Sequence, residues 1–249
     1  MGHISTGRVL DKLDEYLGRN DYAAAERHLL YWLGEAQSAK DDRCALLVQN
    51  ELAGLYRKLG REDDAIRTVS SLLELIDEMG IENNIGAATT YLNCATVYKA
   101  FSKAEESLPL FEKARDIYEK SLSAYDKRFG GLFNNMALAL VDLQRFDEAY
   151  ALYDKAVSVM SQVEDGELEV AITYLNIASA KETQLGAVES DGIVNEYIEK
   201  AMKILDEHEN RDGYYAFVCE KCASVFGYFG YFIYEKDLKK RASEIYEGS

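Results

Sequence analysis

Apolar residues recur along the chain at the three- and four-residue spacing of an amphipathic helix. Val9, Leu13 and Tyr16 fall on one face of the first such segment, and polar or glycine-containing breaks separate the segments that follow. Strand-like alternation is not evident, and the single proline with many helix-forming residues favours helix. The pattern predicts an all-α protein with one repeat domain over residues 1–249. The predicted hairpins cover approximately residues 4–38, 41–79, 84–124, 128–163, 167–207 and 211–247.

Acidic residues and glycines mark the ends of several predicted helices. Asp41 and Asp42 suit a helix start, because carboxylates accept hydrogen bonds from the free amide groups there and meet the positive end of the helix dipole. Gly60 and Gly80 suit helix ends, because glycine readily adopts the left-handed conformation that closes a helix. These signals place one hairpin between Asp41 and Gly80.

A six-residue stretch recurs almost unchanged within the sequence. TYLNCA at residues 90–95 returns 83 residues later as TYLNIA at residues 173–178, and a looser copy, FNNMA, lies at residues 133–137. Aligning the first helix of each hairpin on its alanine gives steps of 42, 42, 41 and 45 residues. An internal repeat of this kind predicts stacked copies of one supersecondary unit. The aligned alanines are Ala53, Ala95, Ala137, Ala178 and Ala223.

Further small residues keep the same register in the second helix of each hairpin. A small residue follows the alanine by 12 positions, at Ala65, Ser107 and Ala149. Small side chains at these points allow the two helices of a hairpin to approach closely. The fifth hairpin departs from this spacing by four extra residues, which we expect to form a longer turn within residues 185–192.

This arrangement resembles the tetratricopeptide repeat family over nearly the whole sequence. An aromatic residue follows the alanine by three positions at Tyr56 and Tyr98, as in that family, although Lys181 departs from the pattern. The common repeat has about 34 residues, so these longer units are more similar to the lengthened repeats of kinesin light chains, which also often hold a proline where Pro109 stands. The resemblance implies a right-handed superhelical solenoid of about six antiparallel hairpins. It also implies a non-catalytic scaffold that binds a protein or peptide segment on its concave face.

The resemblance also implies which residues line that face. In such arrays the residue two positions before the alanine points into the groove, and here it is Asn93, Asn135 and Asn176, with Glu51 before them and Lys221 after. An asparagine amide offers both a donor and an acceptor, so a ladder of asparagines could pair with the backbone of an extended peptide. The alternative is that these asparagines bridge neighbouring helices.

Other predicted groove residues share that face of the first helices: Asn50, Thr96, Lys99, Asn134 and Ser179. The amino-terminal half of the face is more basic, with Arg57, Lys58 and Lys99, and the carboxyl half is more acidic, with Asp142, Glu182 and Glu220. We hypothesise that this gradient orients the bound peptide. Ordinary solvated charges are the alternative interpretation.

Charge and composition narrow the function classes. The formal net charge is −16, which disfavours nucleic acid and anionic membranes as partners because both attract basic surfaces. Without a long apolar run or a signal-peptide pattern, we expect a cytoplasmic protein. The four cysteines, including the Cys219–Cys222 pair, have no metal or disulfide framework, and the three histidines are scattered. We therefore expect buried thiols, no metal, no cofactor and no catalytic residues.

The last hairpin is rich in aromatic residues. Tyr214, Tyr215, Phe217, Phe226 and Tyr228 all lie in its first helix. They are expected to seal the end of the core, or alternatively to form an exposed patch for homodimerisation or partner docking. Two further function classes stay open. The protein could be a self-assembling structural protein, or a regulatory or sensor module for an enzyme or transcription factor in another chain or domain.

Overall fold

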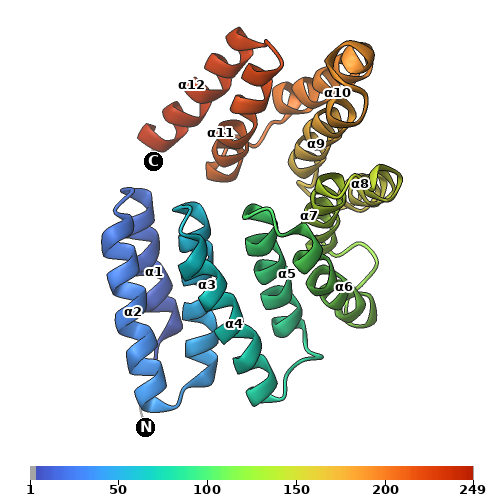
Figure 1. Cartoon of the computed structure of the whole chain (residues 1–249). Helices are drawn as coiled ribbons and strands as arrows, with labels where there is room; N and C mark the ends of the chain where they lie inside the picture. Colours follow the sequence, from blue (N-terminus) through green and yellow to red (C-terminus); the bar gives the residue numbers. More distant parts are fainter. Residues whose placement is uncertain (1–3, 249) are drawn as a thin grey trace. The chain divides into compact units, whose positions relative to one another are not determined.

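The computed structural model describes residues 4–248, and within this range the regular structure is helical throughout. The prediction of an all-α fold is confirmed. The molecule divides into two compact units, Met1–Ser121 and Leu122–Ser249; the single-domain prediction stays a prediction. The first unit contains α1 (Thr6–Gly18), α2 (Tyr22–Ala39), α3 (Asp42–Lys58), α4 (Glu62–Met79), α5 (Ile85–Ala100) and α6 (Ala104–Ser121) (Figure 1). The second contains α7 (Arg128–Asp142), α8 (Phe146–Met160), α9 (Glu167–Leu185), α10 (Ala187–Glu207), α11 (Gly213–Tyr228) and α12 (Phe232–Gly248).

Consecutive helices pair into hairpins, and most hairpins share one turn geometry. In the second hairpin the N–H of Arg61 donates to the carbonyl of Tyr56 at 3.0 Å, across Gly60 with φ of +67°. This hydrogen bond spans five residues and satisfies a carbonyl that the end of the helix would otherwise leave unpaired. The same bond and a left-handed residue recur in the other turns of this type, whose left-handed residues are Asn20, Ser102, Gln144 and Gly230.

The hairpin of α9 and α10 has a different turn. Gly186 alone separates the two helices, with φ of 82° and ψ of 159°, and its N–H donates to the carbonyl of Glu182. The prediction of a longer turn within residues 185–192 is wrong. The extra residues are helical instead: α9 continues to Leu185, and α10 begins immediately after Gly186.

Small residues form the contacts inside and between hairpins, as their register predicts. The five aligned alanines are completely buried, as are Ala65, Ser107 and Ala149 in the second helices. Large apolar side chains such as Phe111 and Phe226 fill the space around them and are also fully buried. Because a repeat buries its apolar face only against its neighbours, this close contact is what makes the stack continuous within each unit.

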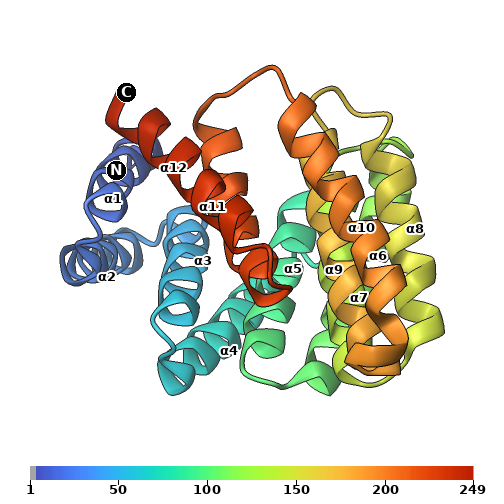
Figure 2. The same cartoon turned by 90° about the horizontal axis from the view of Figure 1, so that it is seen from above.

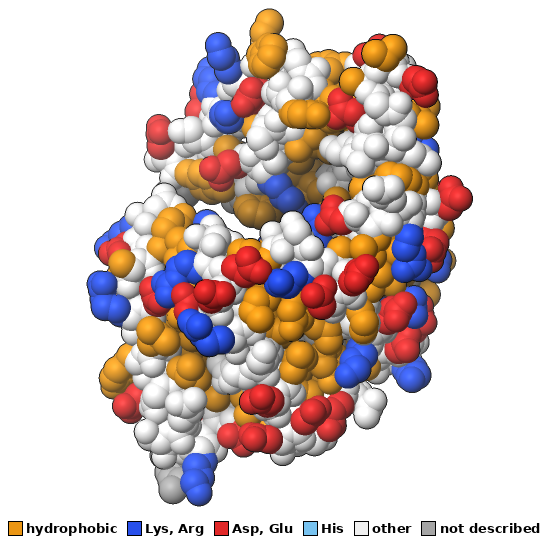
Figure 3. Space-filling model, in the orientation of Figure 1, with side chains coloured by type: hydrophobic (Ala, Val, Ile, Leu, Met, Phe, Trp, Pro, Cys, Tyr) orange, Lys and Arg blue, Asp and Glu red, His pale blue; other side chains and the backbone are white. Residues whose placement is uncertain are grey.

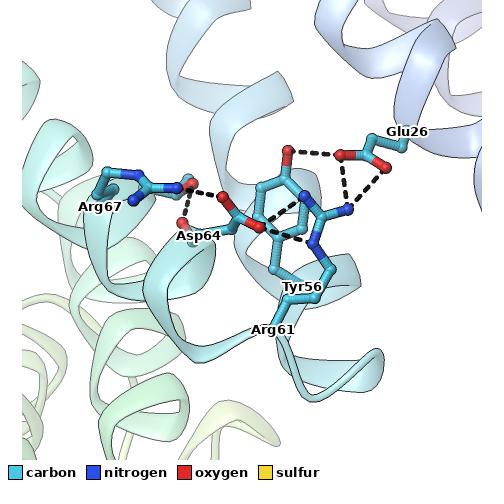
Figure 4. A network of polar contacts seen from close by, with 6 residues as sticks. Glu26, Tyr56, Arg61, Asp64 and Arg67 are labelled. Carbon is cyan, nitrogen blue, oxygen red and sulfur yellow. Dashed lines mark hydrogen bonds and ion pairs between the residues drawn. The ribbon is translucent and has the colours of Figure 1, made fainter.

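A polar network joins the first two hairpins of the first unit (Figure 4). Arg61, just before α4, donates to both carboxylate oxygens of Glu26 in α2 at 2.8 Å, and the hydroxyl of Tyr56 donates to the same carboxylate at 3.1 Å. Arg61 also pairs with Asp64 at 2.6 Å. Burial, together with the neighbouring Glu26, raises the pKa of Tyr56 to about 12. Partly exposed ion pairs stabilise little, about 0–1 kcal/mol each, so this network fixes the orientation of the two hairpins more than their stability.

The aromatic residues of the last hairpin divide between the core and the surface. Tyr215 and Phe226 are fully buried, whereas Tyr214, Phe217 and Tyr228 are exposed. The expectation of a sealed core therefore holds for only part of the set. Among residues 4–248, no helix is both long and apolar enough to cross a membrane.

Candidate functional site

First helices of neighbouring hairpins contact one another in each unit. α3 packs directly on α5, α9 packs on α11, and α7 packs on α9, beside which it lies in Figure 2. The second helix of a hairpin instead packs against the first helix of the next, as α2 does on α3 and α8 on α9. We call the side of each stack on which first helices contact one another the inner face. This inner face is where the sequence places the candidate groove.

Three side chains link α3 to α5 in the first unit. Asn50 of α3 donates from Nδ2 to Oγ1 of Thr90 at 3.1 Å, and Nδ2 of Asn93 donates to Oδ1 of Asn50 at 3.0 Å. The same Nδ2 of Asn50 also donates to the carbonyl of Leu46. We call Asn50, Thr90 and Asn93 the first triad. It ties consecutive repeats together at the inner face.

An equivalent set links α7 to α9 in the second unit. Nδ2 of Asn134 donates to Oγ1 of Thr173 at 2.7 Å, and Nδ2 of Asn176 donates to Oδ1 of Asn134 at 3.2 Å. We call Asn134, Thr173 and Asn176 the second triad. The two triads have the same atoms in the same roles, and they explain why residues 90–95 return almost unchanged at residues 173–178.

The third predicted ladder residue makes a different contact. Nδ2 of Asn135 donates to the carbonyl of Gly131 in its own helix at 2.8 Å. Asn93, Asn135 and Asn176 are all half-buried. Asn93 and Asn176 therefore make the helix-bridging bonds of the alternative interpretation, and all three side chains stay partly exposed. Their groove role stays a prediction.

The remaining candidate groove residues differ in how they are held. The hydroxyls of Thr96 and Ser179 donate to carbonyls one turn earlier in their own helices, at 2.8 and 3.1 Å. Glu51 is half-buried, and burial together with the nearby Asp14 raises the pKa of its carboxyl group. Lys99 is half-buried and Lys221 is exposed. That these polar groups line one binding face stays a prediction.

The charged residues proposed to orient a peptide are mostly at the surface. Arg57 and Lys58 are exposed, and the Lys58 ammonium lies 4.9 Å from the centre of the Tyr22 ring. Asp142 and Glu220 are exposed in the second unit. The gradient between the two halves stays a prediction.

The thiols are placed as the sequence predicts. All four cysteines are buried and free. Burial raises the pKa of Cys94 and of Cys222 to about 12, so both stay protonated and poorly nucleophilic at neutral pH. Within residues 4–248, no three His, Cys, Asp or Glu side chains are grouped as metal ligands.

Sequence reasoning missed the role of the two hub residues and their threonine partners. Asn50 and Asn134 are predicted groove residues, and each of them also joins two repeats, because it accepts a hydrogen bond from one residue of the next repeat and donates one to another. The signal was present in the spacing. Asn50 precedes Asn93 by 43 residues, and Asn134 precedes Asn176 by 42 residues, so each hub falls one repeat before the asparagine that it accepts from.

Stacked hairpins with adjoining first helices and small residues in register define an α-helical repeat protein. Residues 42–120 match the model of the Tetratricopeptide repeat family. Residues 42–120 therefore contain tetratricopeptide repeats, and the described residues have the fold of solved proteins with such repeats, which confirms the predicted resemblance.

Solved structures of similar fold include the two that follow. BtubC (BKLC) from P. vanneervenii is 19% identical, with a TM-score of 0.68, over 82% of this chain and 82% of that one. The nearly identical TPR-like repeats of a candidate kinesin light chain from Podosopora anserina are 16% identical, with a TM-score of 0.54, over 80% of this chain and 94% of that one. At these identities the likeness concerns the fold alone. The comparison with curated protein sequences gave no match.

Proposed function

We propose that this protein is a non-catalytic scaffold that binds a protein or peptide segment on the inner face of its first helices. The observation that carries the proposal is the pair of triads, which hold the half-buried amides of Asn93 and Asn176 in fixed positions at that face. A side chain that is already immobilised loses little conformational entropy when it binds a ligand. A binding face needs such pre-organised groups, whereas helix packing alone needs only the small apolar residues.

The chemistry of these positions suits a peptide backbone. Each asparagine has two amide hydrogens and a carbonyl oxygen with two acceptor sites. Asn93 and Asn176 each direct an amide hydrogen to the preceding repeat, so a second hydrogen and the oxygen remain to pair with a carbonyl and an N–H of a peptide backbone. Asn135 repeats the same chemistry one hairpin along. Side chains between these contacts would give specificity.

The charge of the protein bears on the kind of partner. Acidic and basic side chains are interspersed over the face drawn in Figure 3, and the formal net charge is −16. Such a surface repels polyanions at long range and tolerates neutral or basic proteins. We therefore propose a protein or peptide partner and not nucleic acid or an anionic membrane.

The test compares two sets of alanine variants. The first combines Asn93→Ala, Asn135→Ala and Asn176→Ala, and the second combines Asn50→Ala with Asn134→Ala. Affinity capture from the source cells, followed by identification of the bound proteins, is run with both sets and with the unmodified protein. Circular dichroism checks that each variant stays helical.

We expect the first set to lose the captured partner. The hub variants keep the groove amides but no longer hold those of Asn93 and Asn176 in place, so they should bind the partner more weakly and also lose stability. Full retention of the partner by the first set, with helical content unchanged, would rule out the asparagine ladder.

A second candidate function is self-association through the last hairpin. The observation that favours it is the exposure of Tyr214, Phe217 and Tyr228 along α11, because exposed aromatic clusters are typical of interfaces. Solution mass across a dilution series, measured for the unmodified protein and for a Phe217→Ser variant, tests this candidate. A monomer mass at every concentration for the unmodified protein would exclude it.

A further inference from the structure

A hollow lies between α10 and α12 of the second unit. It is a cavity of about 670 Å³ lined by Met202 and Asp206 of α10 and by residues at the start of α12. Its size falls in the range of about 300–1,000 Å³ that is usual for sites binding small ligands or side chains. We call it the α10–α12 groove.

The rim of the α10–α12 groove is apolar and exposed. Phe232 is 62% exposed and Ile233 is 88% exposed, although both are large apolar residues, and Met202 and Tyr234 beside them are half-buried. Covering such side chains removes apolar surface from water, which is favourable. The rim therefore offers contact area to an apolar side chain.

The floor of the groove contains two carboxylates that share one cation. Nη2 of Arg241 lies 2.8 Å from Oδ1 of Asp206 and 2.5 Å from Oδ2 of Asp237. Because both oxygens contact the same nitrogen, they are at most 5.3 Å apart, the sum of these two distances. Two negative charges against one positive charge leave the floor with a net charge of −1.

The remaining contacts leave part of each carboxylate available. The hydroxyl of Tyr234 donates to the same Oδ1 of Asp206 at 2.9 Å, and burial and this bond raise the pKa of Tyr234, so that it stays a donor. Arg241 is held from the other side by the hydroxyl of Tyr215 at 3.0 Å. These bonds use Oδ1 of Asp206 and Oδ2 of Asp237, and both residues are partly exposed. The second oxygen of each can accept from a ligand.

We propose that the α10–α12 groove is a second binding site, independent of the inner face, for a partner segment that carries a lysine or arginine beside an apolar residue. The cationic group would lie on Asp206 and Asp237 and neutralise the excess negative charge. The apolar side chain would cover Phe232 and Ile233. Charge complementarity selects this occupant: an acidic segment would add to the negative charge of the floor, and a purely apolar one would leave the carboxylates without a new partner.

The test uses three soluble peptides that differ at one position. Their cores are Leu-Arg-Leu, Leu-Gln-Leu and Leu-Glu-Leu, and binding is followed by amide chemical shifts in NMR titrations of the protein of residues 1–249. We expect the arginine peptide to shift the resonances of Asp206, Ile233 and Asp237. The glutamine peptide should bind roughly fivefold more weakly, as the loss of one partly exposed ion pair implies, and the glutamate peptide more weakly still.

Matched variants separate the two parts of the site. Ile233→Ser should lower the affinity for the arginine peptide, whereas Val188→Ser, which changes a side chain 91% exposed outside the groove, should not. Asp237→Asn should abolish the preference for arginine over glutamine. Asn176→Ala, on the inner face, should change nothing here, so failure of this proposal is distinct from failure of the proposed function.

Three results would overturn the proposal. Equal affinity for the arginine and glutamine peptides would show that the site does not select a cationic side chain. Chemical shift changes confined to other residues would show that the peptide does not bind in the α10–α12 groove. Changes at Ile233 on diluting the protein alone would assign the rim to a second copy of this protein.

Discussion

The triads of the two units make the same hydrogen bonds in different surroundings. The hub of the first triad, Asn50, is half-buried and shares its amide with the carbonyl of Leu46. The hub of the second triad, Asn134, is 5% exposed, and its bond to Thr173 is 2.7 Å long. The bonding pattern therefore follows from the repeated residues themselves. The contribution of each triad to the free energy of unfolding depends on how well water can replace its hydrogen bonds.

The largest expected difference is between the two hubs. Asn134→Ala should destabilise the second unit by about 2–3 kcal/mol, because it leaves buried groups unpaired in a place that water reaches poorly. Asn50→Ala should cost the first unit only about 1 kcal/mol, because its site is half-exposed. Urea unfolding with native-state hydrogen exchange measures both.

A neighbouring residue provides the control for the hubs. Asn135 bonds only within its own helix among the contacts described, so Asn135→Ala should be close to neutral. Equal losses for Asn50→Ala and Asn134→Ala would show that burial does not set the weight of a triad.

The turns after the two repeated six-residue stretches should respond with opposite signs. Gly186 has φ of 82° and ψ of 159°, a region open essentially to glycine alone, so Gly186→Ala should cost the second unit about 1–3 kcal/mol. Ser102, in the corresponding turn of the first unit, has φ of +59°. Ser102→Gly should relieve the strain of this left-handed conformation and stabilise the first unit by up to about 1 kcal/mol. Thermal unfolding of both variants measures these changes in stability. A higher unfolding temperature for Gly186→Ala would contradict the turn geometry.

The helices, several of their ends and the burial of the aligned alanines could be predicted from the sequence. The periodicity of apolar residues and the alanine register are local signals, and each aligned alanine is buried as its register predicts. The side chain of Asp41 caps the start of α3, and Gly60 and Gly80 follow helix ends in the left-handed conformation that the sequence predicts. Bonds between repeats need two residues that are far apart in sequence, so the hubs could be found only by comparing offsets between repeats.

The turn of the fifth hairpin could not be predicted in the same way. Four extra residues can lengthen either a loop or a helix, and the count alone does not distinguish these outcomes. The buried Ser190 and Val194 keep a four-residue spacing through this stretch, which is consistent with the early start of α10. One glycine with a conformation open to few other residues then suffices for the reversal.

A third difference lies at one core position of the second helices. Phe111 of α6 and Tyr153 of α8 occupy the same place in their repeats, four residues after Ser107 and Ala149, and both are fully buried. The hydroxyl of Tyr153 has no hydrogen-bond partner among the described residues. Tyr153→Phe should therefore stabilise the second unit by about 1 kcal/mol, because it removes an unpaired buried polar group. Phe111→Tyr should do the reverse in the first unit, and urea midpoints measure both.

The smallest expected difference concerns the repeat position of the asparagine ladder, two residues before the aligned alanine. In the first unit this position holds Glu51 in α3, whereas in the second unit α7 holds the neutral Asn135. Burial, with the nearby Asp14, raises the pKa of Glu51 above its usual value. The folded first unit therefore binds that proton more strongly than the unfolded protein does, and stability falls as the pH rises through the raised pKa. Glu51→Gln removes this titration, so it should stabilise the first unit at neutral pH, with an advantage that shrinks toward about pH 4, where the carboxyl group is increasingly protonated. Urea midpoints of both proteins across this range measure the effect, and an advantage that stays constant with pH would assign it to packing and not to charge.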